Sequence, residues 1–213
     1  MNGCQQIGIF GGSFNPITKA HIIIAQSIIQ KTYIDQVFLT PCYEHTQKNK
    51  LADSSHRLEM CKIAVNGLNN LKVFDYEIKN QLSSGTYDFI QKLLADKELN
   101  EEREFSYIIG MDNVKIFNTW INYEQLKKTI RFIVVPRPGS KPLSETDWYS
   151  RHPHLCLNSP LLNMSSSHVR FLLKLWWKNI PMVKSILRSC ILKEVDAKVL
   201  SYIESNGLYK GEK

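Results

Sequence analysis

Long hydrophobic runs are missing from this sequence of 213 residues. No stretch approaches the ~18 consecutive apolar residues that a membrane-spanning helix needs. The N-terminal residues also lack the basic segment followed by an apolar stretch that is typical of a signal peptide. We therefore expect a cytoplasmic protein that does not bind membranes.

Cysteine is scarce: the chain has five, far apart in the sequence and without a C-x-x-C pair. This odd number and wide spacing argue against a disulfide framework and against a zinc knuckle. His152 and His154 have no third potential ligand nearby in the sequence, which favours a surface loop, and no metal site is predicted. We expect reduced thiols at Cys4, Cys42, Cys61, Cys156 and Cys190.

Two common phosphate-binding patterns are absent as well. The sequence contains neither G-x-x-x-x-G-K-[ST] nor the G-x-G-x-x-G fingerprint of dinucleotide sites. Because these loops hold the phosphates in their respective families, their absence argues against a kinase and against a dehydrogenase.

Basic residues are in excess, with 27 Lys and Arg against 20 Asp and Glu and a formal net charge of +7. Such a charge predicts an anionic partner. The lysines are spread along the chain and are not interleaved with aromatic residues, as they are in platforms for single-stranded nucleic acid. This distribution favours a local anion site, and we expect no nucleic-acid partner.

Short apolar segments typical of strands alternate with amphipathic segments typical of helices. We expect strands at 7–10, 36–40, 72–76, 105–109, 131–135 and 154–157, and helices at 20–31, 54–68, 87–94, 123–128, 166–176, 182–188 and 196–206. The segment after Val135 is rich in proline, glycine and polar residues, which predicts a long surface loop. The alternation predicts an α/β fold, a Rossmann-like, doubly wound, mostly parallel sheet. We expect a single domain over 1–213, with a C-terminal helical portion from about residue 165.

The segment GIFGGSFNPITKAH, residues 8–21, follows directly from the first expected strand. Gly11 and Gly12 let the backbone come close to a ligand. Thr18 is placed to cap the next helix, which makes His21 its third residue, near the exposed N–H groups. Since ligands of open parallel sheets bind at the carboxyl ends of the strands, this constellation predicts a phosphate site. The alternative is a plain turn followed by a solvated histidine.

A second potential anion site lies in MSSSHVR, residues 164–170. Any of its three serines could cap the following helix, and Arg170 could reach a phosphate bound at the helix start. Taken alone, the segment fits an ordinary capped helix with a surface arginine equally well.

Several segments, in this order, resemble the nucleotidylyltransferase superfamily with its (H/T)-x-G-H motif, and within it the nicotinate/nicotinamide mononucleotide adenylyltransferases. They are GGSFNPITKAH, HRLEM, SGTYDFI, YIIGMDN followed by Trp120, FIVVPRPG, MSSSHVR and YIESNGLY, and they span almost the whole chain. The resemblance implies ATP and a pyridine mononucleotide as partners, with Mg²⁺ as cofactor. In that reaction the mononucleotide phosphate attacks the α-phosphorus and pyrophosphate leaves, so catalysis is positioning and charge stabilisation.

The resemblance places His21 at the ATP phosphates and the developing charge, and Thr18 at the first position of the motif. Ala20 stands where the motif has glycine. The resemblance also implies that Gly110 and Asp112 contact the ATP ribose. The catalytic pair is then His21 and Thr18, and the implied ATP-binding residues are Gly11, Gly12, Ser13, Phe14, His21, Gly110, Asp112, Ser166, Ser167 and Arg170.

On the mononucleotide side, the resemblance implies that Trp120 stacks on the pyridine ring. Either Lys48 or Lys50 would bind the mononucleotide phosphate. A tyrosine of the family segment S-Y-T-x-D is replaced by Gly85, which departs from the pattern. The implied mononucleotide-binding residues are Asn15, Lys48, Thr86, Asp88, Trp120 and Arg137.

Three alternatives stay open at this point. The bacterial-type motifs favour nicotinate as the pyridine, whereas the eukaryote-like opening GSFNPIT leaves nicotinamide open. A nucleotidylyltransferase of the pantetheine-phosphate or glycerol-phosphate type shares the opening motif, but Trp120 and the PRPG segment argue against it. A basic nucleic-acid-binding protein with a vestigial motif is the alternative of a different class. A homo-oligomer is also left open.

Overall fold

The computed structural model describes residues 4–44, 50–136, 147–157, 164–178 and 181–211. At its centre is a six-stranded sheet in the order β3-β2-β1-β4-β5-β6, in which all neighbouring strands are parallel. This is a doubly wound order that reverses between β1 and β4, so the predicted Rossmann-like α/β fold is confirmed. The strands are β1 (Gln5–Gly12), β2 (Gln36–Pro41), β3 (Leu71–Val73), β4 (Arg103–Gly110), β5 (Arg131–Val135) and β6 (Leu155–Cys156).

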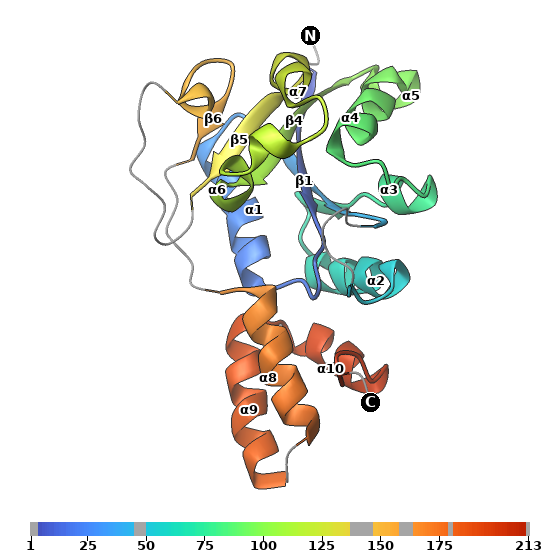
Figure 1. Ribbon diagram of the computed structural model, residues 1–213, viewed down its shortest axis with the longest axis vertical. Coiled ribbons are helices and arrows are strands. Elements are labelled where there is room, and N and C mark those ends of the chain that lie inside the picture. Colours follow the sequence, from blue (N-terminus) through green and yellow to red (C-terminus); the bar gives the residue numbers. More distant parts are fainter. Residues whose placement is uncertain (1–3, 45–49, 137–146, 158–163, 179–180, 212–213) are drawn as a thin grey trace.

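Helices connect the strands and continue beyond the last one (Figure 1). The longer ones are α1 (Lys19–Lys31), α2 (Ser54–Val65), α4 (Thr86–Ala95), α7 (Tyr123–Thr129), α8 (Ser166–Lys178), α9 (Pro181–Glu194) and α10 (Ala197–Ser205). The short ones are α3 (Tyr76–Lys79), α5 (Lys97–Asn100), α6 (Met111–Val114) and the 3-10 helices η1 (Phe117–Thr119) and η2 (Trp148–Ser150).

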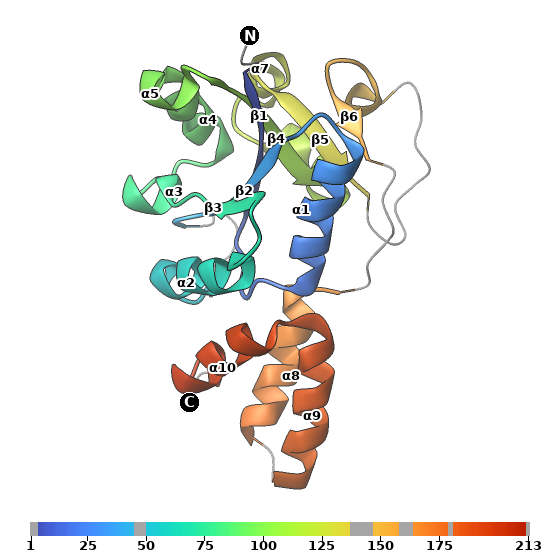
Figure 2. The ribbon, with the colours of Figure 1, turned by 180° about the vertical axis from the view of Figure 1, so that it is seen from behind.

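Side chains of the central strands alternate between two hydrophobic layers, as expected from the two-residue period of a strand. Tyr107 and Phe132 pack into a cluster with residues of α4 and α7. Ile108 and Ile133, one residue further on, pack into a cluster with residues of α1. Figure 1 shows α7 in front of the sheet, and Figure 2, from behind, shows α1 on the opposite face.

The C-terminal helices α8, α9 and α10 lie beyond one end of the sheet (Figure 1). Their buried residues, including Val169 and Leu200, form one cluster with Phe14 and Ile17 of the segment after β1. Because of this packing, the start of α8 is held against the start of α1. The division of the chain into one domain with a helical portion stays a prediction.

One expected strand is wrong in part. The segment 72–76 was expected to be extended, but β3 ends at Val73 and Tyr76 begins α3. The rings of Phe74 and Tyr76 stack with centroids 5.4 Å apart, and they pack on Phe38 and Phe89. Burial of these aromatic rings therefore replaces further pairing at the edge of the sheet. No helix within the described ranges is long and apolar enough to cross a membrane.

Candidate active site

Two adjoining cavities open at the carboxyl ends of β1 and β4, where the strand order reverses. The α1–α8 cavity has a volume of about 300 Å³ and the α3–α4 cavity about 400 Å³. Both are lined by Gly11, Gly12, Ser13 and Asn113, so they share a floor. The α3–α4 cavity is completed by Cys42, Glu44, Glu77, Ser84, Gly85, Thr86, Tyr107, Ile116, Thr119, Trp120 and Ile121.

The structure brings the whole expected ATP-binding set together in the α1–α8 cavity. The residues that line it include Gly11, Gly12, Ser13, Phe14, His21, Gly110, Asp112, Ser166, Ser167 and Arg170. These residues come from three separate segments of the chain, 11–21, 110–112 and 166–170, and strand pairing accounts for the closeness of the first two alone.

His21 is held in one orientation by the residue that begins its helix. Thr18 is the N-cap of α1, as expected, and its backbone N–H donates to Nδ1 of His21 at 3.0 Å. An Nδ1 that accepts from a backbone N–H is unprotonated, so the proton of the neutral ring is on Nε2. The Phe14 ring meets the imidazole edge to face at 5.1 Å. The ring can therefore present a hydrogen-bond donor to an anion in the cavity.

The N-terminus of α8 lies in the same cavity. Ser165 caps this helix, because its side-chain oxygen accepts from the backbone N–H of His168 at 3.1 Å. Ser166 Oγ donates to the Pro16 carbonyl at 2.8 Å and ties the helix start to the segment after β1. The starts of α1 and α8 therefore converge on one cavity, and both helix dipoles favour an anion there.

Arg170 links the two helix starts. Its guanidinium donates to the Asn15 carbonyl at 2.7 Å and to Ser167 Oγ at 3.1 Å. These contacts orient the side chain along the wall of the α1–α8 cavity. A guanidinium with five donors keeps further N–H groups for phosphate oxygens.

The structure adds a packing reason for the two glycines at the end of β1. A Cβ atom on Gly11 would lie 2.2 Å from the Tyr107 hydroxyl, and one on Gly12 would lie 3.2 Å from the Phe14 ring. Only glycine fits at position 11 without moving Tyr107, a buried residue of β4. The glycine pair thus serves the tertiary packing as well as the expected approach to a ligand.

The α3–α4 cavity contains two of the expected mononucleotide residues, Trp120 and Thr86. The Trp120 ring rests on Phe117, with centroids 5.2 Å apart. Thr86 is the first residue of α4, so the N-terminus of this ten-residue helix faces the cavity. Asp88 does not line either cavity. It accepts from Ser84 Oγ at 2.6 Å and pairs with Lys92 at 3.1 Å, and these hydrogen bonds hold the pKa of its carboxyl below the ordinary value.

Two further expected residues, Asn15 and Thr18, do not line either cavity. Asn15 is buried, and its Oδ1 accepts from the Ala52 N–H at 3.1 Å and from the Tyr209 hydroxyl at 2.8 Å. It therefore joins the segment after β1 to the C-terminal residues. Thr18 is also buried and acts behind His21. The expected residues Lys48 and Arg137 lie outside the described residues.

Sequence reasoning missed several residues that the fold brings to the cavities. Asn113 directly follows the expected Asp112 and lines both cavities, so its place in the motif was a usable signal. Glu77 and Tyr107 line the α3–α4 cavity, and burial raises the pKa of Glu77 to about 7. Burial also raises the pKa of Tyr107. No local pattern in the sequence marks either residue.

Buried Arg57, from the segment HRLEM, organises the loops around the shared floor. Its guanidinium donates to the carbonyls of Ser13 at 3.0 Å, Tyr43 at 2.8 Å and Ala52 at 2.9 Å. This one side chain joins the ends of β1 and β2 to the segment before α2. The shape of the shared floor therefore depends on Arg57, a residue for which the sequence predicted no role.

Comparison with known proteins identifies the family. The cytidylyltransferase-like family model matches residues 9–172. A Streptococcus mutans protein named "Probable nicotinate-nucleotide adenylyltransferase" is 32% identical over 97% of this chain and 89% of its own length. A Streptococcus pneumoniae protein of the same name is 33% identical over 96% of this chain and 89% of its own.

Solved structures agree over the whole chain. Plasmodium falciparum nicotinic acid mononucleotide adenylyltransferase complexed with NaAD has a TM-score of 0.78 and 26% identity, covering 98% of both chains. The same enzyme complexed with APC has a TM-score of 0.74. These matches, with the two streptococcal relatives, show that the chain belongs to the cytidylyltransferase-like family and, within it, to the nicotinate-nucleotide adenylyltransferases, which are nucleotidyltransferases.

Proposed function

We propose that this protein transfers the adenylyl group of ATP to nicotinate mononucleotide, producing the dinucleotide and pyrophosphate in NAD biosynthesis. The observation that carries the proposal is the pair of adjoining cavities that share Gly11, Gly12 and Ser13 as a floor. ATP would occupy the α1–α8 cavity and the mononucleotide the α3–α4 cavity. The two reacting phosphates would then meet over the end of β1.

In this arrangement the mononucleotide phosphate attacks the α-phosphorus of ATP and pyrophosphate leaves, so no protein nucleophile is needed. The protein contributes positioning and charge stabilisation. His21 Nε2 donates to a phosphoryl oxygen, with its ring oriented by Thr18. Arg170 and the serines that begin α8 hold the leaving phosphates.

Mg²⁺ supplies neutralisation of phosphate charge when it is bound together with ATP. Among the described residues, no group of three or more His, Cys, Asp or Glu side chains is placed to hold a metal ion. Asp112 contributes a carboxylate to the α1–α8 cavity and is the residue that would contact the ion or the ATP ribose. These residues fit an ion held chiefly by the phosphates of ATP.

On the mononucleotide side, Trp120 would stack on the pyridine ring and Thr86 would lie beside it. The α4 N-terminus offers N–H groups and the positive end of a helix dipole to the cavity. A carboxylate substituent gains more there than an amide, which favours nicotinate over nicotinamide mononucleotide.

The expected cytoplasmic location is consistent with the state of the cysteines. All five fall within the described residues, and none of them forms a disulfide there. Free thiols in this number suit a reducing compartment, where ATP is also available.

The test is turnover of purified protein with ATP and Mg²⁺ and either nicotinate or nicotinamide mononucleotide, followed by dinucleotide and pyrophosphate formation. We expect nicotinate mononucleotide to have the higher kcat/KM. CTP in place of ATP and phosphopantetheine in place of the mononucleotide are matched controls and should give little product. Absence of dinucleotide from both mononucleotides would contradict the proposal, and salt-dependent DNA or RNA binding without turnover would support the nucleic-acid alternative.

A further inference from the structure

The two cavities differ in the balance of their charged side chains. Within the described lining residues, the charged side chains of the α3–α4 cavity are Glu44 and Glu77, both acidic. The α1–α8 cavity is lined by Arg170 and His21 together with one acidic residue, Asp112, and receives two helix N-termini. A ligand that spans the shared floor therefore meets the only Lys or Arg side chain of the two described linings, Arg170, at one end, and two carboxylates beside the α4 N-terminus at the other.

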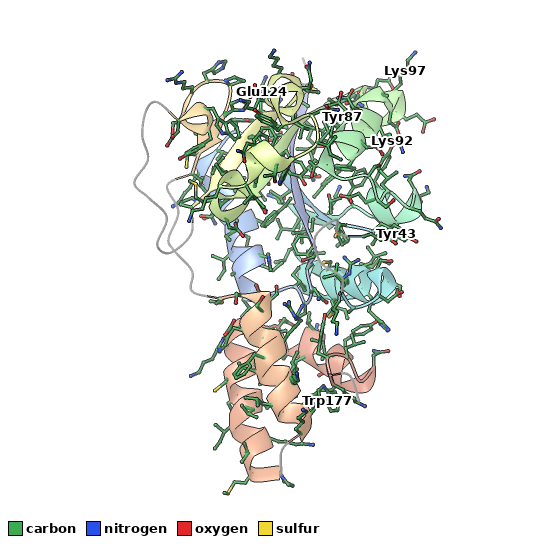
Figure 3. All side chains as sticks on the ribbon, viewed as in Figure 1. Tyr43, Tyr87, Lys92, Lys97, Glu124 and Trp177 are labelled. Atoms are coloured by element: carbon green, nitrogen blue, oxygen red, sulfur yellow. The ribbon has the colours of Figure 1, made fainter. Side chains whose placement is uncertain are left out.

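Glu77 is the more enclosed of the two acids. It lies on α3, is only partly accessible, and accepts a hydrogen bond from the backbone N–H of Tyr43, a residue that Figure 3 shows near α3. Glu44 is exposed at the rim. The carboxyl of Glu77 is thus positioned by the protein before any ligand arrives.

The groups that face Glu77 come from each element around it. Arg57 of α2 favours its ionised form, and Tyr107 of β4 lies close enough to interact with it electrostatically. Cys42 and Glu44, from the segment after β2, line the same cavity. Burial outweighs Arg57 and raises the pKa of Glu77 to about 7.

Resting on the proposed function, we propose that Glu77 is a specificity-determining residue that recognises the positive charge of the pyridinium ring of the mononucleotide. A pyridine joined to ribose through its nitrogen carries a fixed positive charge without a proton. Trp120 offers an aromatic face to such a cation and Glu77 offers an opposite charge in the same cavity. Stacking alone would accept any flat ring, whereas the acid selects a charged one.

The ligands that isolate this effect are nicotinamide mononucleotide and its reduced dihydropyridine form. They share ribose, phosphate and amide, but only the oxidised ring is cationic. Both carry the same phosphate, whose second pKa is about 6, so its titration cancels in the ratio of their dissociation constants. We would measure both by calorimetry with wild type, Glu77→Gln and Glu44→Gln, from about pH 5.5 to about pH 8.5.

We expect wild type to prefer the oxidised ligand and the preference to grow with pH as Glu77 ionises. Glu77→Gln should lose about tenfold of that preference and most of its pH dependence, with binding of the reduced ligand nearly unchanged. Glu77→Asp, which keeps the charge, should retain part of the preference. Glu44→Gln, the matched rim control, should change it far less.

Three results would overturn the inference. The first is an unchanged preference for the oxidised ligand in Glu77→Gln, and the second is an equal weakening of the binding of both ligands in that variant. The third is a larger change of the preference in Glu44→Gln than in Glu77→Gln. Because the measurement is binding, it separates the two proposals. A protein that binds both ligands with the expected preference but forms no dinucleotide would contradict the proposed function alone. A protein that binds neither ligand but turns over nicotinate mononucleotide would contradict the inference alone.

Discussion

The α1–α8 cavity and the α3–α4 cavity share a floor but are built in different ways. Much of the first cavity comes from two continuous segments, residues 10–24 and 164–170, whose members bond one another. The second draws its lining from the ends of β1 and β2, from α3, α4 and β4, and from the segment around η1. The comparison teaches that a cavity built largely from two short segments can be marked by sequence motifs, whereas one assembled from many elements depends on the whole tertiary fold.

The comparison is tested most strongly at His21. His21→Ala should lower kcat on the order of 10²-fold or more, because it removes an oriented donor from the transition state. Thr18→Ala should lower kcat less. It should lower the free energy of unfolding by about 1 kcal/mol, because α1 loses its N-cap side chain. The measurement is kcat with ATP, Mg²⁺ and nicotinate mononucleotide, with a thermal melt as control. A stable His21→Ala protein with wild-type turnover would contradict the role of this residue.

Substitution of Arg170 should change the KM for ATP more than the KM for the mononucleotide. Arg170→Ala should raise KM for ATP by about 10- to 100-fold through the loss of a charged hydrogen-bond donor, with a smaller change for the mononucleotide. Arg170→Lys should restore ATP binding only in part, because an ammonium cannot make the two-pronged contact. An unchanged KM for ATP in Arg170→Ala would place the arginine outside the phosphate site.

Substitution of Trp120 should have the opposite effect and change the KM for the mononucleotide more than the KM for ATP. Trp120→Ala should raise KM for the mononucleotide about tenfold and leave KM for ATP nearly unchanged, because aromatic stacking is lost on one side only. Trp177→Ala is the matched control, since Trp177 lies on α8 away from the sheet (Figure 3). The control should lower Tm without separating the two constants. Equal changes of both constants in Trp120→Ala would indicate a role in packing alone.

The shared floor is tested through stability. Gly11→Ala should lower the free energy of unfolding by about 1–3 kcal/mol, because its Cβ meets the Tyr107 hydroxyl. Tyr107→Phe should relieve part of this loss in the double variant, since it removes the closest atom. Chemical denaturation of both single variants and the double variant gives the coupling energy. Additive losses would show that residues 11 and 107 do not compete for space.

Glu77 gives a prediction of a different kind, a change in how stability depends on pH. Its carboxyl keeps its proton in the folded state up to a pKa of about 7, against an ordinary value of 4.5. The folded state therefore binds more protons between these values, and stability falls as pH rises through this range. Glu77→Gln removes this term, so its Tm relative to wild type should be higher at about pH 8 than at about pH 5. A pH-independent difference would contradict the raised pKa.

The same contrast explains what the sequence could predict. The cap at Thr18, the third helical position of His21 and the strand 131–135 follow from local spacing, and the structure has them as expected. The position of Glu77 did not follow, because Phe74 and Tyr76 suggested a strand where aromatic packing instead starts α3. The close approach of residues 11 and 107 joins two paired strands that are far apart in the sequence, so no local pattern reveals it.

The shared floor also has a kinetic consequence. In the proposed arrangement, each substrate binds in one cavity and can leave by breaking one set of contacts. The dinucleotide product is a single molecule with one end in each cavity, so a released end rebinds at a high effective concentration while the other end stays bound. Product departure is then slower than departure of either substrate. A rigid inhibitor that bridges Gly11, Gly12 and Ser13 would use the same advantage.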